Sequence, residues 1–384
     1  MNRPEIRTLE RMVAAPTVSN RPMIELAAYV AQRAEDQGFR VELQEDPDRP
    51  GKANVLAFAG PDDMPGEGLM LSGHLDVVPV EGQEWSSDPF TLTAVGDRLV
   101  GRGSSDMKGF IAAAITGLDD LDVTKLSKPL VLAWTHDEEV GCVGSARIAS
   151  LYSQDPRPLP KECWIGEPTD FQIFRMHPGH VAVELEVRGV SAHSSKPDLG
   201  ASAIKGMMRL IEVINGLEAD LMQERRLERY LDRPYVTLNA GTLSAGSAVN
   251  MVPDRAVLRL GYRPLPGDTP DALQHRLRER LENTSLPKGC TWTMRQLRAT
   301  PAMLTPEGIP LQGLLEPHCC GGEPAAASFA TDGGNLADLG VSSLIFGPGS
   351  IDVAHAPDEY VEVRALSQAV GMVQDVVRRR CFGS

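Results

Sequence analysis

Five segments of the sequence carry histidines and carboxylates of the kind that bind metal ions. Four of them directly follow apolar segments that resemble strands, and the fifth is a glycine-rich loop leading into a predicted helix. A mixed set of nitrogen and oxygen donors suits Zn²⁺. Two metal ions would need a bridging carboxylate, and hydrolysis would need a further carboxylate to move protons. The five segments are Gly73-His74-Leu75-Asp76, residues 101–109 with Asp106, His136-Asp137-Glu138-Glu139, Gly166-Glu167-Pro168, and residues 347–350 with His355 shortly after.

Each segment taken alone also has an ordinary structural interpretation. His74 and Asp76 could form a surface pair, and Glu138 with Glu139 could begin a solvated helix. Asp106 could cap a helix. The joint placement favours a metal site, because the carboxyl ends of neighbouring parallel strands meet at one edge of a sheet. Rival chemistries lack their motifs, since we find no third glycine of a dinucleotide fingerprint, no GxxxxGK[ST] loop, no HExxH helix and no GxSxG nucleophile.

The elements that must position these residues follow an α/β pattern. Short apolar runs alternate with helical segments, which is typical of a mostly parallel sheet covered by helices. We expect strands at 54–59, 68–72, 129–135, 163–165 and 343–346, and helices at 109–118, 144–152 and the C-terminus.

The middle of the chain has a different pattern. Residues 181–188 alternate apolar and polar side chains, as in a half-exposed antiparallel strand. A helix (201–217), two strands (235–240 and 256–262), a helix (270–282) and a strand (291–297) are expected after it. This β-α-β-β-α-β order predicts a small α+β domain. The predicted boundaries are 1–177 for the first part of the larger domain, 178–298 for the insert, and 299–384 for the second part.

Composition and charge exclude several classes of function. The 384 residues include 38 Lys and Arg and 52 Asp and Glu, which gives a net charge of −14. A phosphate backbone would repel so acidic a chain, so we expect no nucleic-acid partner. No apolar run approaches the ~20 residues of a membrane span, and the N-terminus lacks the apolar core of a signal peptide. Six cysteines without framework spacing fit a reduced compartment, and we expect a soluble cytoplasmic protein.

Taken together, these motifs resemble those of the M20 family of zinc metallopeptidases and deacylases. The resemblance covers nearly the whole chain, and residues 137–142 (DEEVGC) and the insert length are most similar to the acetylornithine deacetylases of that family. Two segments depart from the pattern: residues 176–180 (MHPGH) and 331–334 (TDGG). The matching segments are residues 72–79, Trp85 with 88–90, 101–109, 137–142, 166–169, and 354–355 with 358–360.

The resemblance implies a zinc-peptidase-like fold whose insert is a ferredoxin-like lid and dimerisation domain. It implies two Zn²⁺ ions, with Co²⁺ or Mn²⁺ able to occupy similar ligands. Asp106 would bridge the two ions. His74 and Glu167 would complete one site, and Glu139 and His355 would complete the other.

The resemblance also implies roles around the metal ligands. Glu138 would be the general base and acid, and the Asp76 carboxylate would fix the tautomer of His74. The peptide bond between Asp106 and Met107 would be cis. His193, supplied by the partner subunit of a homodimer, would stabilise the oxyanion.

A small N-acyl amino acid is the substrate that the resemblance implies. Asn250, Arg263, Gly347 and Ser350 would contact it, although Arg263 could equally form a structural ion pair. The expected reaction is hydrolysis of N²-acetyl-L-ornithine to L-ornithine and acetate, a step of arginine biosynthesis. A succinyl-diaminopimelate desuccinylase, an acetylcitrulline deacetylase and a dipeptidase stay open. A catalytically silent relative that binds metal or amino acids is a candidate of a different class.

Overall fold

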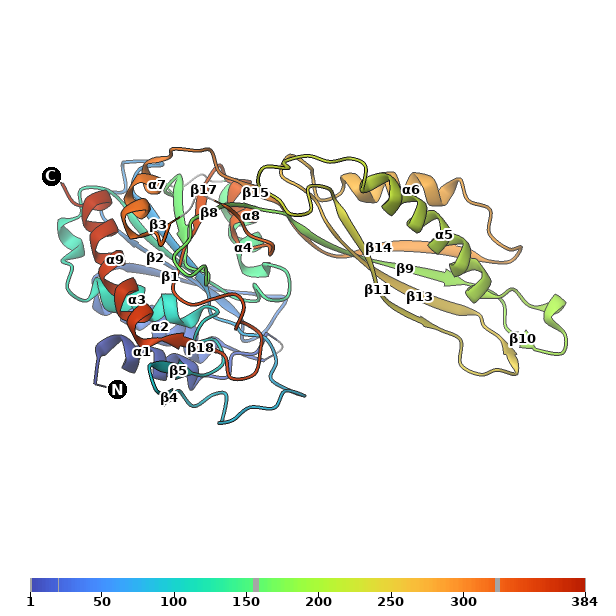
Figure 1. Ribbon diagram of the computed structural model, residues 1–384, viewed down its shortest axis with the longest axis horizontal. Coiled ribbons are helices and arrows are strands. Elements are labelled where there is room, and N and C mark those ends of the chain that lie inside the picture. The colour runs from blue at the N-terminus through green and yellow to red at the C-terminus, as the bar shows by residue number, and fades with distance from the viewer. Residues whose placement is uncertain (1, 20, 155–158, 322–324, 384) are drawn as a thin grey trace. The chain divides into compact units, whose positions relative to one another are not determined.

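The computed structural model describes residues 2–19, 21–154, 159–321 and 325–383, and its contacts divide the chain into two units. The first unit comprises Met1–Met176, Leu304–Ala327 and Thr331–Ser384. The second comprises His177–Met303 and Ser328–Ala330, and we call it the inserted unit because it interrupts the first (Figure 1). The expected insert, residues 178–298, lies within it.

A nine-stranded sheet runs through the described part of the first unit, in the order β1-β2-β6-β3-β7-β17-β8-β15 with β16 beside β8. The central strands β6, β3, β7 and β17 are parallel. Strands β1 and β2 pair antiparallel with their neighbours, and β8 pairs antiparallel with β17 but parallel with β16. This confirms the predicted α/β fold with a mostly parallel central sheet. The strands are β1 (Arg40–Glu45), β2 (Ala53–Ala59), β3 (Leu69–His74), β6 (Leu130–Thr135), β7 (Glu162–Ile165), β8 (Phe174–His177), β15 (Met303–Leu304), β16 (Ala325–Ala326) and β17 (Ser342–Ile345).

Burial on both faces explains why the central strands are apolar throughout. Every residue of β3, β6 and β7 is buried, as expected for parallel strands with helices on each side. Helix α3 is also buried at every position and packs against α1, α9 and β3. The helices are α1 (Pro4–Val13), α2 (Ile24–Asp36), α3 (Lys108–Leu118), α4 (Val143–Ser153), α7 (Pro310–Leu315), α8 (Gly333–Ala337) and α9 (Val363–Cys381).

A small antiparallel sheet of the first unit, in the order β18-β5-β4, joins distant parts of the chain. Its strands are β4 (Thr93–Val95), β5 (Arg98–Val100) and β18 (Tyr360–Glu362). This sheet brings the segment after His355 beside the glycine-rich loop that carries Asp106, since Tyr360 pairs with Val100. The sequence patterns did not predict it.

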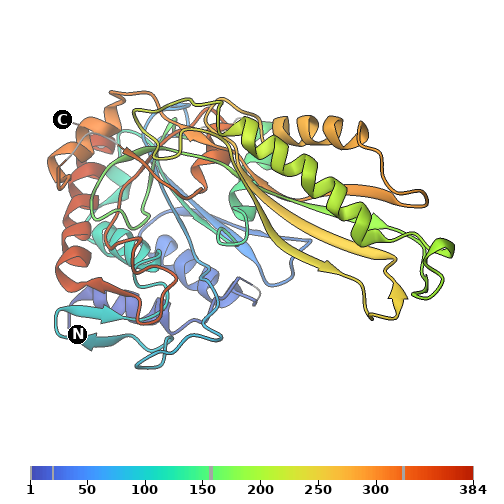
Figure 2. The ribbon, with the colours of Figure 1, turned by 45° about the vertical axis from the view of Figure 1, so that its right-hand side comes forward.

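The inserted unit is a four-stranded antiparallel sheet in the order β11-β13-β9-β14, with α5 and α6 on one face (Figure 2). The main elements follow the predicted β-α-β-β-α-β order. Apolar residues of β9 and β13 pack under the helices, and the opposite face of the sheet is polar. Its elements are β9 (His180–Arg188), β10 (Ala192–His193), α5 (Ala203–Leu221), β11 (Thr237–Ala245), β12 (Met251–Val252), β13 (Arg255–Arg263), α6 (Ala272–Glu282) and β14 (Thr291–Thr300).

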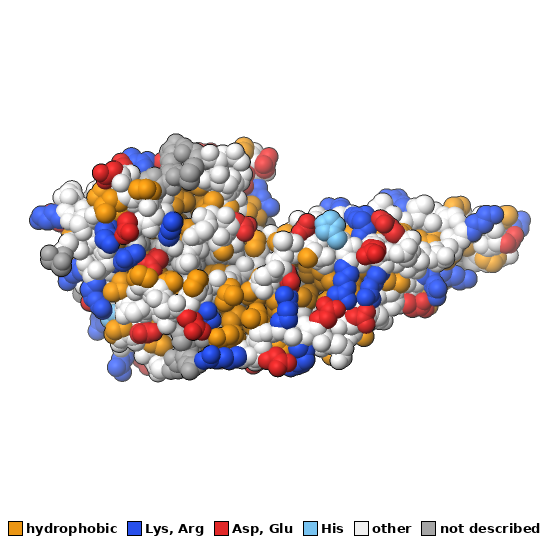
Figure 3. Space-filling view, turned by 90° about the horizontal axis from the view of Figure 1, so that it is seen from above, with side chains coloured by type: hydrophobic (Ala, Val, Ile, Leu, Met, Phe, Trp, Pro, Cys, Tyr) orange, Lys and Arg blue, Asp and Glu red, His pale blue; other side chains and the backbone are white. Residues whose placement is uncertain are grey.

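The surface of the inserted unit carries charged side chains of both signs (Figure 3). Acidic and basic side chains are intermixed on the face of the inserted unit seen in Figure 3. Pairs such as Arg276 with Glu224 and Arg280 with Asp220 balance these charges locally. Among the described residues, no helix is long and apolar enough to cross a lipid bilayer.

Candidate metal centre

The predicted metal ligands of the first unit come together at the carboxyl ends of the parallel strands. His74 is the last residue of β3, Glu139 follows β6, and Glu167 follows β7. Asp106 lies just before α3, and His355 lies in the loop between β17 and β18. The side chains converge because parallel strands direct their following loops to the same edge of the sheet.

Asp106 lies between the two histidines. Its Oδ1 atom is 2.9 Å from Nε2 of His74, and its Oδ2 atom is 3.1 Å from Nε2 of His355. Glu167 approaches Nε2 of His74 to 3.7 Å, and Glu139 approaches Nε2 of His355 to 3.1 Å. Each oxygen of one carboxylate therefore faces a different histidine, and each histidine has a second carboxylate beside it. The peptide bond between Asp106 and Met107 is cis, as the family resemblance implied.

These spacings are close to those of a pair of metal ions. A Zn²⁺ ion with ligands at about 2.0–2.2 Å in tetrahedral geometry separates its donor atoms by roughly 3.3–3.6 Å. The donor pairs described above are 2.9, 3.1, 3.1 and 3.7 Å apart, so three are shorter and one is longer than this range. One donor group would be His74, Asp106 and Glu167, and the other would be His355, Asp106 and Glu139. Both contain imidazole nitrogen and carboxylate oxygen, the donors that divalent transition metals favour.

The ionisation of the cluster reflects its concentration of negative charge. Burial raises the pKa of Glu139 to about 7, and it raises the pKa of Glu167 well above its usual range. Burial alone would lower the pKa of His74, but the hydrogen bond to Asp106 and the charges of Glu167 and Asp106 outweigh it and raise that pKa. Divalent cations would relieve the repulsion among these carboxylates.

Asp76 supports the cluster in a different way from the one expected. Nδ1 of His74 lies 2.9 Å from the main-chain carbonyl oxygen of Asp76 but 3.7 Å from its carboxylate. The carbonyl therefore orients the imidazole. The carboxylate instead accepts hydrogen bonds from the backbone N–H groups of Glu138 and Glu139, at 3.0 and 3.3 Å, and from the hydroxyl of Ser19 at 2.8 Å. It thus holds the segment that carries two of the candidate residues.

Glu138 lies half-buried beside Cys142 and Asp332. The Cys142 thiol is 3.3 Å from its carboxylate. Asp332, from the segment that departs from the family pattern, is 3% exposed and accepts a hydrogen bond from the Thr135 hydroxyl at 2.6 Å. Burial raises the pKa of Glu138 well above its usual range, and the nearby charge of Asp332 adds to this effect. A raised pKa is the property expected of a carboxylate that takes up and returns a proton.

The neighbouring Asp137 has a structural role. Its carboxylate pairs with Lys52 at 2.6 Å and Arg49 at 2.8 Å and is almost fully buried. These cations lower its pKa to about 2 despite the burial that opposes ionisation. Of the three consecutive acidic residues, Asp137 is thus paired with cations, and Glu138 and Glu139 are the candidates for the centre.

Glu359 is a supporting residue whose role the sequence patterns did not reveal. Its fully buried carboxylate accepts hydrogen bonds from the backbone N–H groups of Gly103, Ser105 and Asp106, at 2.9 to 3.1 Å. It also pairs with Arg102 at 2.5 Å. Residues 101–106 and 359 are therefore fixed to one another. The available signal was that residues 358–360 are among the segments that match the family pattern.

The loop with Gly347 and Ser350 lies against the ligand-bearing loops of the first unit. The backbone N–H of Gly347 donates to the Thr169 hydroxyl at 3.1 Å, and the carbonyl of Ser350 accepts from the Ser105 hydroxyl at 3.3 Å. A Cβ atom at Gly347 would lie 2.4 Å from the carbonyl oxygen of Gly166. Only glycine permits this close approach.

The other three predicted residues belong to the inserted unit. His193, on β10, and Asn250, just before β12, are neighbours, since the N–H of Ser194 donates to the Asn250 carbonyl at 2.9 Å. Arg263, at the end of β13, forms no ion pair with any carboxylate in the described part of the chain. The structural ion pair that the sequence left open for Arg263 is thus not observed.

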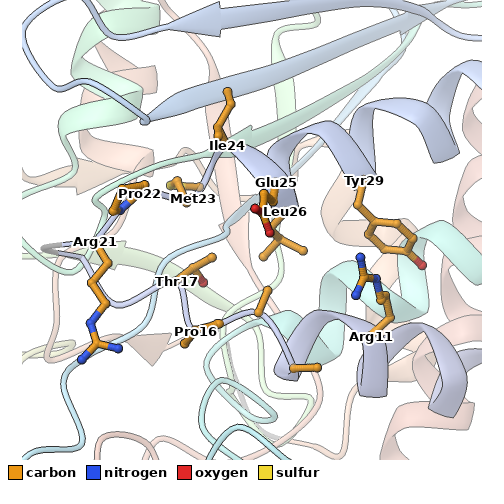
Figure 4. A pocket seen from close by; sticks show the side chains of 12 residues that line it. Arg11, Pro16, Thr17, Arg21, Pro22, Met23, Ile24, Glu25, Leu26 and Tyr29 are labelled. Carbon is orange, nitrogen blue, oxygen red and sulfur yellow. The ribbon is translucent and has the colours of Figure 1, made fainter.

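A separate hollow of about 350 Å³ opens at the N-terminal helices (Figure 4). The Arg11 guanidinium lies 5.8 Å from the centre of the Tyr29 ring on its wall. Arg21, also on the wall, pairs with Glu81. None of the candidate metal ligands lines this hollow.

Comparison with known proteins agrees with the geometry. The family model "Peptidase family M20/M25/M40" matches residues 70–379. The chain is 35% identical over 389 residues to an acetylornithine deacetylase of Klebsiella pneumoniae (strain 342), covering 99% of this chain and 98% of that protein.

Solved structures show the same fold. An M20 family metallo-carboxypeptidase of Sulfolobus solfataricus has a TM-score of 0.76 at 19% identity, covering 98% of this chain and 99% of that one. A dinuclear metal-binding M20 peptidase of Bacillus subtilis, YXEP, has a TM-score of 0.67 at 13% identity, covering 97% and 96%. The protein is a metal-dependent hydrolase of amide bonds. The chain belongs to the M20/M25/M40 peptidase family.

Proposed function

We propose that this protein is a deacylase that hydrolyses N²-acetyl-L-ornithine to L-ornithine and acetate, a step of arginine biosynthesis. The observation that carries the proposal is the position of Asp106 between His74 and His355, with Glu138 beside the cluster. The 35% identity to an acetylornithine deacetylase, over 99% of the chain, supports the choice of substrate.

Two divalent metal ions would be held by the two donor groups defined above. Zn²⁺ suits the mixture of imidazole and carboxylate, and Co²⁺ or Mn²⁺ could occupy the same ligands. When bound, such a pair polarises a carbonyl and lowers the pKa of water, which makes an attacking hydroxide available near neutral pH.

Glu138 would move the proton in this reaction. It accepts a proton from the attacking water as the new C–O bond forms at the acyl carbon. It returns the proton to the amine nitrogen as the C–N bond breaks, so that the products are acetate and a free amine. The Asp76 carboxylate keeps Glu138 in place through the backbone N–H at 3.0 Å.

His193 would donate a hydrogen bond to the developing oxyanion, acting from the partner subunit of a homodimer. Its Nδ1 atom accepts a hydrogen bond from the backbone N–H of Ser195 at 3.2 Å, which leaves the proton of the neutral ring on Nε2. An Nε2–H group on an exposed strand can reach a ligand. Asn250 and Arg263 of the inserted unit, with Gly347 and Ser350, would contact the rest of the substrate.

The first test compares substrates on the metal-loaded enzyme. We expect preference for N-acetylornithine over N-acetylcitrulline, N-succinyl-diaminopimelate and a dipeptide, and loss of activity with a chelator. Preference for another of these compounds would change the proposed substrate but leave the proposed hydrolytic reaction unchanged. Two bound metal ions without turnover of any of them would favour the catalytically silent alternative.

A second test addresses the proton-transfer role. Glu138→Gln is expected to retain both metal ions and to lose turnover by at least about 100-fold, the lower range for general acid–base catalysis. Glu81→Gln, which breaks the exposed pair with Arg21, is the control and should retain full turnover. Unchanged turnover in Glu138→Gln would contradict the assignment.

Co-expression tests the contribution of His193 from the partner subunit. His193→Ala and Glu138→Gln chains are each expected to be nearly inactive alone. In a mixed dimer, one site combines an intact Glu138 with the intact His193 of the other chain. A statistical mixture should then recover about a quarter of wild-type activity, since half the dimers are mixed and each has one complete site. If activity does not recover, His193 acts in the active site of its own chain or takes no part in any active site.

A further inference from the structure

The segment that carries Glu138 and Glu139, residues 137–142, joins β6 to α4 in a backbone conformation that needs support. Asp137 and Cys142, its first and last residues, have φ angles of 52° and 54°. Residues other than glycine keep such left-handed conformations only where their surroundings hold them. The contacts around the segment therefore decide where the Glu138 carboxylate lies.

Asn54 of β2 supports both ends of this segment. Its Oδ1 atom accepts a hydrogen bond from the N–H of His136 at 3.2 Å, and its amide group donates to the carbonyl of Gly144 at 2.9 Å. Asn54 is fully buried, and a Cβ atom at Gly144 would lie 2.4 Å from its Oδ1 atom. The two ends are thus fixed, but these contacts do not reach Asp137 or Glu138.

Lys52 supports the part of the segment next to Glu138. It directly precedes β2 and lies two residues before Asn54, a spacing that places two side chains on one side of an extended chain. Its ammonium group is 2.6 Å from the carboxylate of Asp137, and the two side chains are 7% and 1% exposed. The same ammonium group donates to the main-chain carbonyl of Ser19 at 2.7 Å. A single buried cation therefore contacts two separate parts of the chain.

The contact with Ser19 leads back to Glu138. The hydroxyl of Ser19 donates to Oδ2 of Asp76 at 2.8 Å. Oδ1 of Asp76 in turn accepts a hydrogen bond from the backbone N–H of Glu138 at 3.0 Å. This route joins Lys52 to the backbone of Glu138. A second and shorter route is the ion pair between Lys52 and Asp137, the residue that precedes Glu138.

Charge balance alone does not account for the placement of Lys52. The guanidinium group of Arg49 pairs with the Asp137 carboxylate at 2.8 Å, so this carboxylate has another cationic partner. A buried ammonium group costs free energy unless its charge and its donors are satisfied. What Lys52 adds is the link between the Asp137 side chain and the carbonyl of Ser19.

We infer that Lys52 is a positioning residue for amide hydrolysis. It keeps the carboxylate of Glu138 where proton transfer needs it, and it acts through Asp137 and Ser19 without contacting the substrate. The inference rests on the proposed function, because it takes Glu138 as the group that moves the proton. Displacement of a reacting group by about 1 Å costs on the order of 100-fold in rate. Loss of the ammonium group should therefore lower turnover far more than substrate binding.

The first test separates turnover from binding. Lys52→Met, at saturating metal and with the preferred substrate of the panel described above, is expected to lower kcat at least about tenfold and to leave KM within about twofold. Lys128→Met is the matched control, since Lys128 forms a partly exposed pair with Glu67 at 2.9 Å. It should leave both constants within about twofold. A wild-type kcat in Lys52→Met would overturn the inference.

A double variant separates positioning from stability. Lys52→Met combined with Asp137→Asn removes both charges of the ion pair, so no unpaired charge is left buried. We expect it to recover any melting temperature that Lys52→Met loses, while kcat stays at least about tenfold below that of the wild type, because neither route to Glu138 is restored. Recovery of kcat together with the melting temperature would overturn the inference, since the role of Lys52 would then be charge balance.

Hydrogen–deuterium exchange separates this inference from the proposed function, because it measures the segment without measuring activity. In the metal-loaded proteins, the backbone amides of residues 136–142 are expected to exchange at least about tenfold faster in Lys52→Met than in the wild type, and at the wild-type rate in Lys128→Met.

The two ideas fail in different ways. Exchange at the wild-type rate in Lys52→Met would overturn the inference, and the role of Glu138 would stand if Glu138→Gln still loses turnover. Faster exchange in Lys52→Met, together with full turnover in Glu138→Gln, would show that Lys52 holds the segment and that the proton-transfer role proposed for Glu138 is wrong.

Discussion

Replacing Glu359 by glutamine is expected to destabilise the first unit although the residue binds no metal. Its carboxylate has four donors: Arg102 and the N–H of Gly103 on one oxygen, and the N–H groups of Ser105 and Asp106 on the other. A glutamine amide offers one oxygen and one NH₂ group, so two of these donors lose their acceptor in either orientation.

The magnitude follows from burial. The side chains of Arg102 and Glu359 are 1% and 0% exposed, and the variant leaves the arginine as an uncompensated buried charge. Removal of one partner of a buried pair costs about 3–5 kcal/mol. The exposed pair of Arg21 and Glu81, with side chains 49% and 62% exposed, sets the comparison. Its loss in Glu81→Gln should cost less than about 1 kcal/mol.

Urea unfolding followed by tryptophan fluorescence measures both variants. Trp134 and Trp164 are fully buried in the first unit and report its unfolding. We expect Glu359→Gln to lower the free energy of unfolding by about 3–5 kcal/mol, and a second change, Arg102→Met, to recover part of it. A loss of unfolding free energy no larger than that of Glu81→Gln would refute the reasoning, because Arg102 would then not be an uncompensated buried charge in the variant.

Two further predictions concern the metal centre. The Asp76→Asn substitution weakens the hydrogen bonds that position Glu138 and Glu139, so it should lower metal affinity about 10- to 100-fold. Competition with a fluorescent chelator measures this affinity. An effect no larger than that of Ser19→Ala would contradict the prediction. Metal affinity should also rise with pH. His355, whose hydrogen bonds to Asp106 and Glu139 raise its pKa to about 11, must lose a proton to bind metal. Below about pH 7, Glu139 must also lose a proton, so metal affinity should depend more steeply on pH in that range. A metal affinity that does not change between pH 5.5 and 8.5 would refute this prediction.

The sequence predicted the part of the centre that local pattern determines. The apolar runs of β3, β6 and β7 are recognisable because these strands are buried on both faces. The residues that follow them had to meet at one edge of the sheet, which placed His74, Glu139 and Glu167 together. His355 was a candidate because it follows the predicted strand at 343–346, but its place beside Glu139 was assigned from the family resemblance. No local pattern determines where a loop 188 residues after Glu167 returns.

Other features depended on contacts that the sequence does not encode locally. Hydrogen-bond geometry decides whether the carbonyl or the carboxylate of Asp76 orients His74, and the carbonyl is the closer of the two. The role of Glu359 requires the small sheet that joins residues 98–100 to 360–362. The placement of Arg298 on the polar face of the inserted sheet depends on a register shift in β14, because strict alternation would direct this side chain to the opposite face.

The order of the ligands along the chain has a consequence for biosynthesis. Four of the five candidate ligands precede the inserted unit, whereas His355 and its neighbour Glu359 follow it. During translation the ribosome therefore completes the whole insert before the last ligand is made. A nascent chain that ends within the insert holds only His74, Asp106, Glu139 and Glu167, with the loop before α3 not yet fixed by Glu359. Metal capture at the complete centre is thus a late event, which occurs once the C-terminal segment has returned to the first unit.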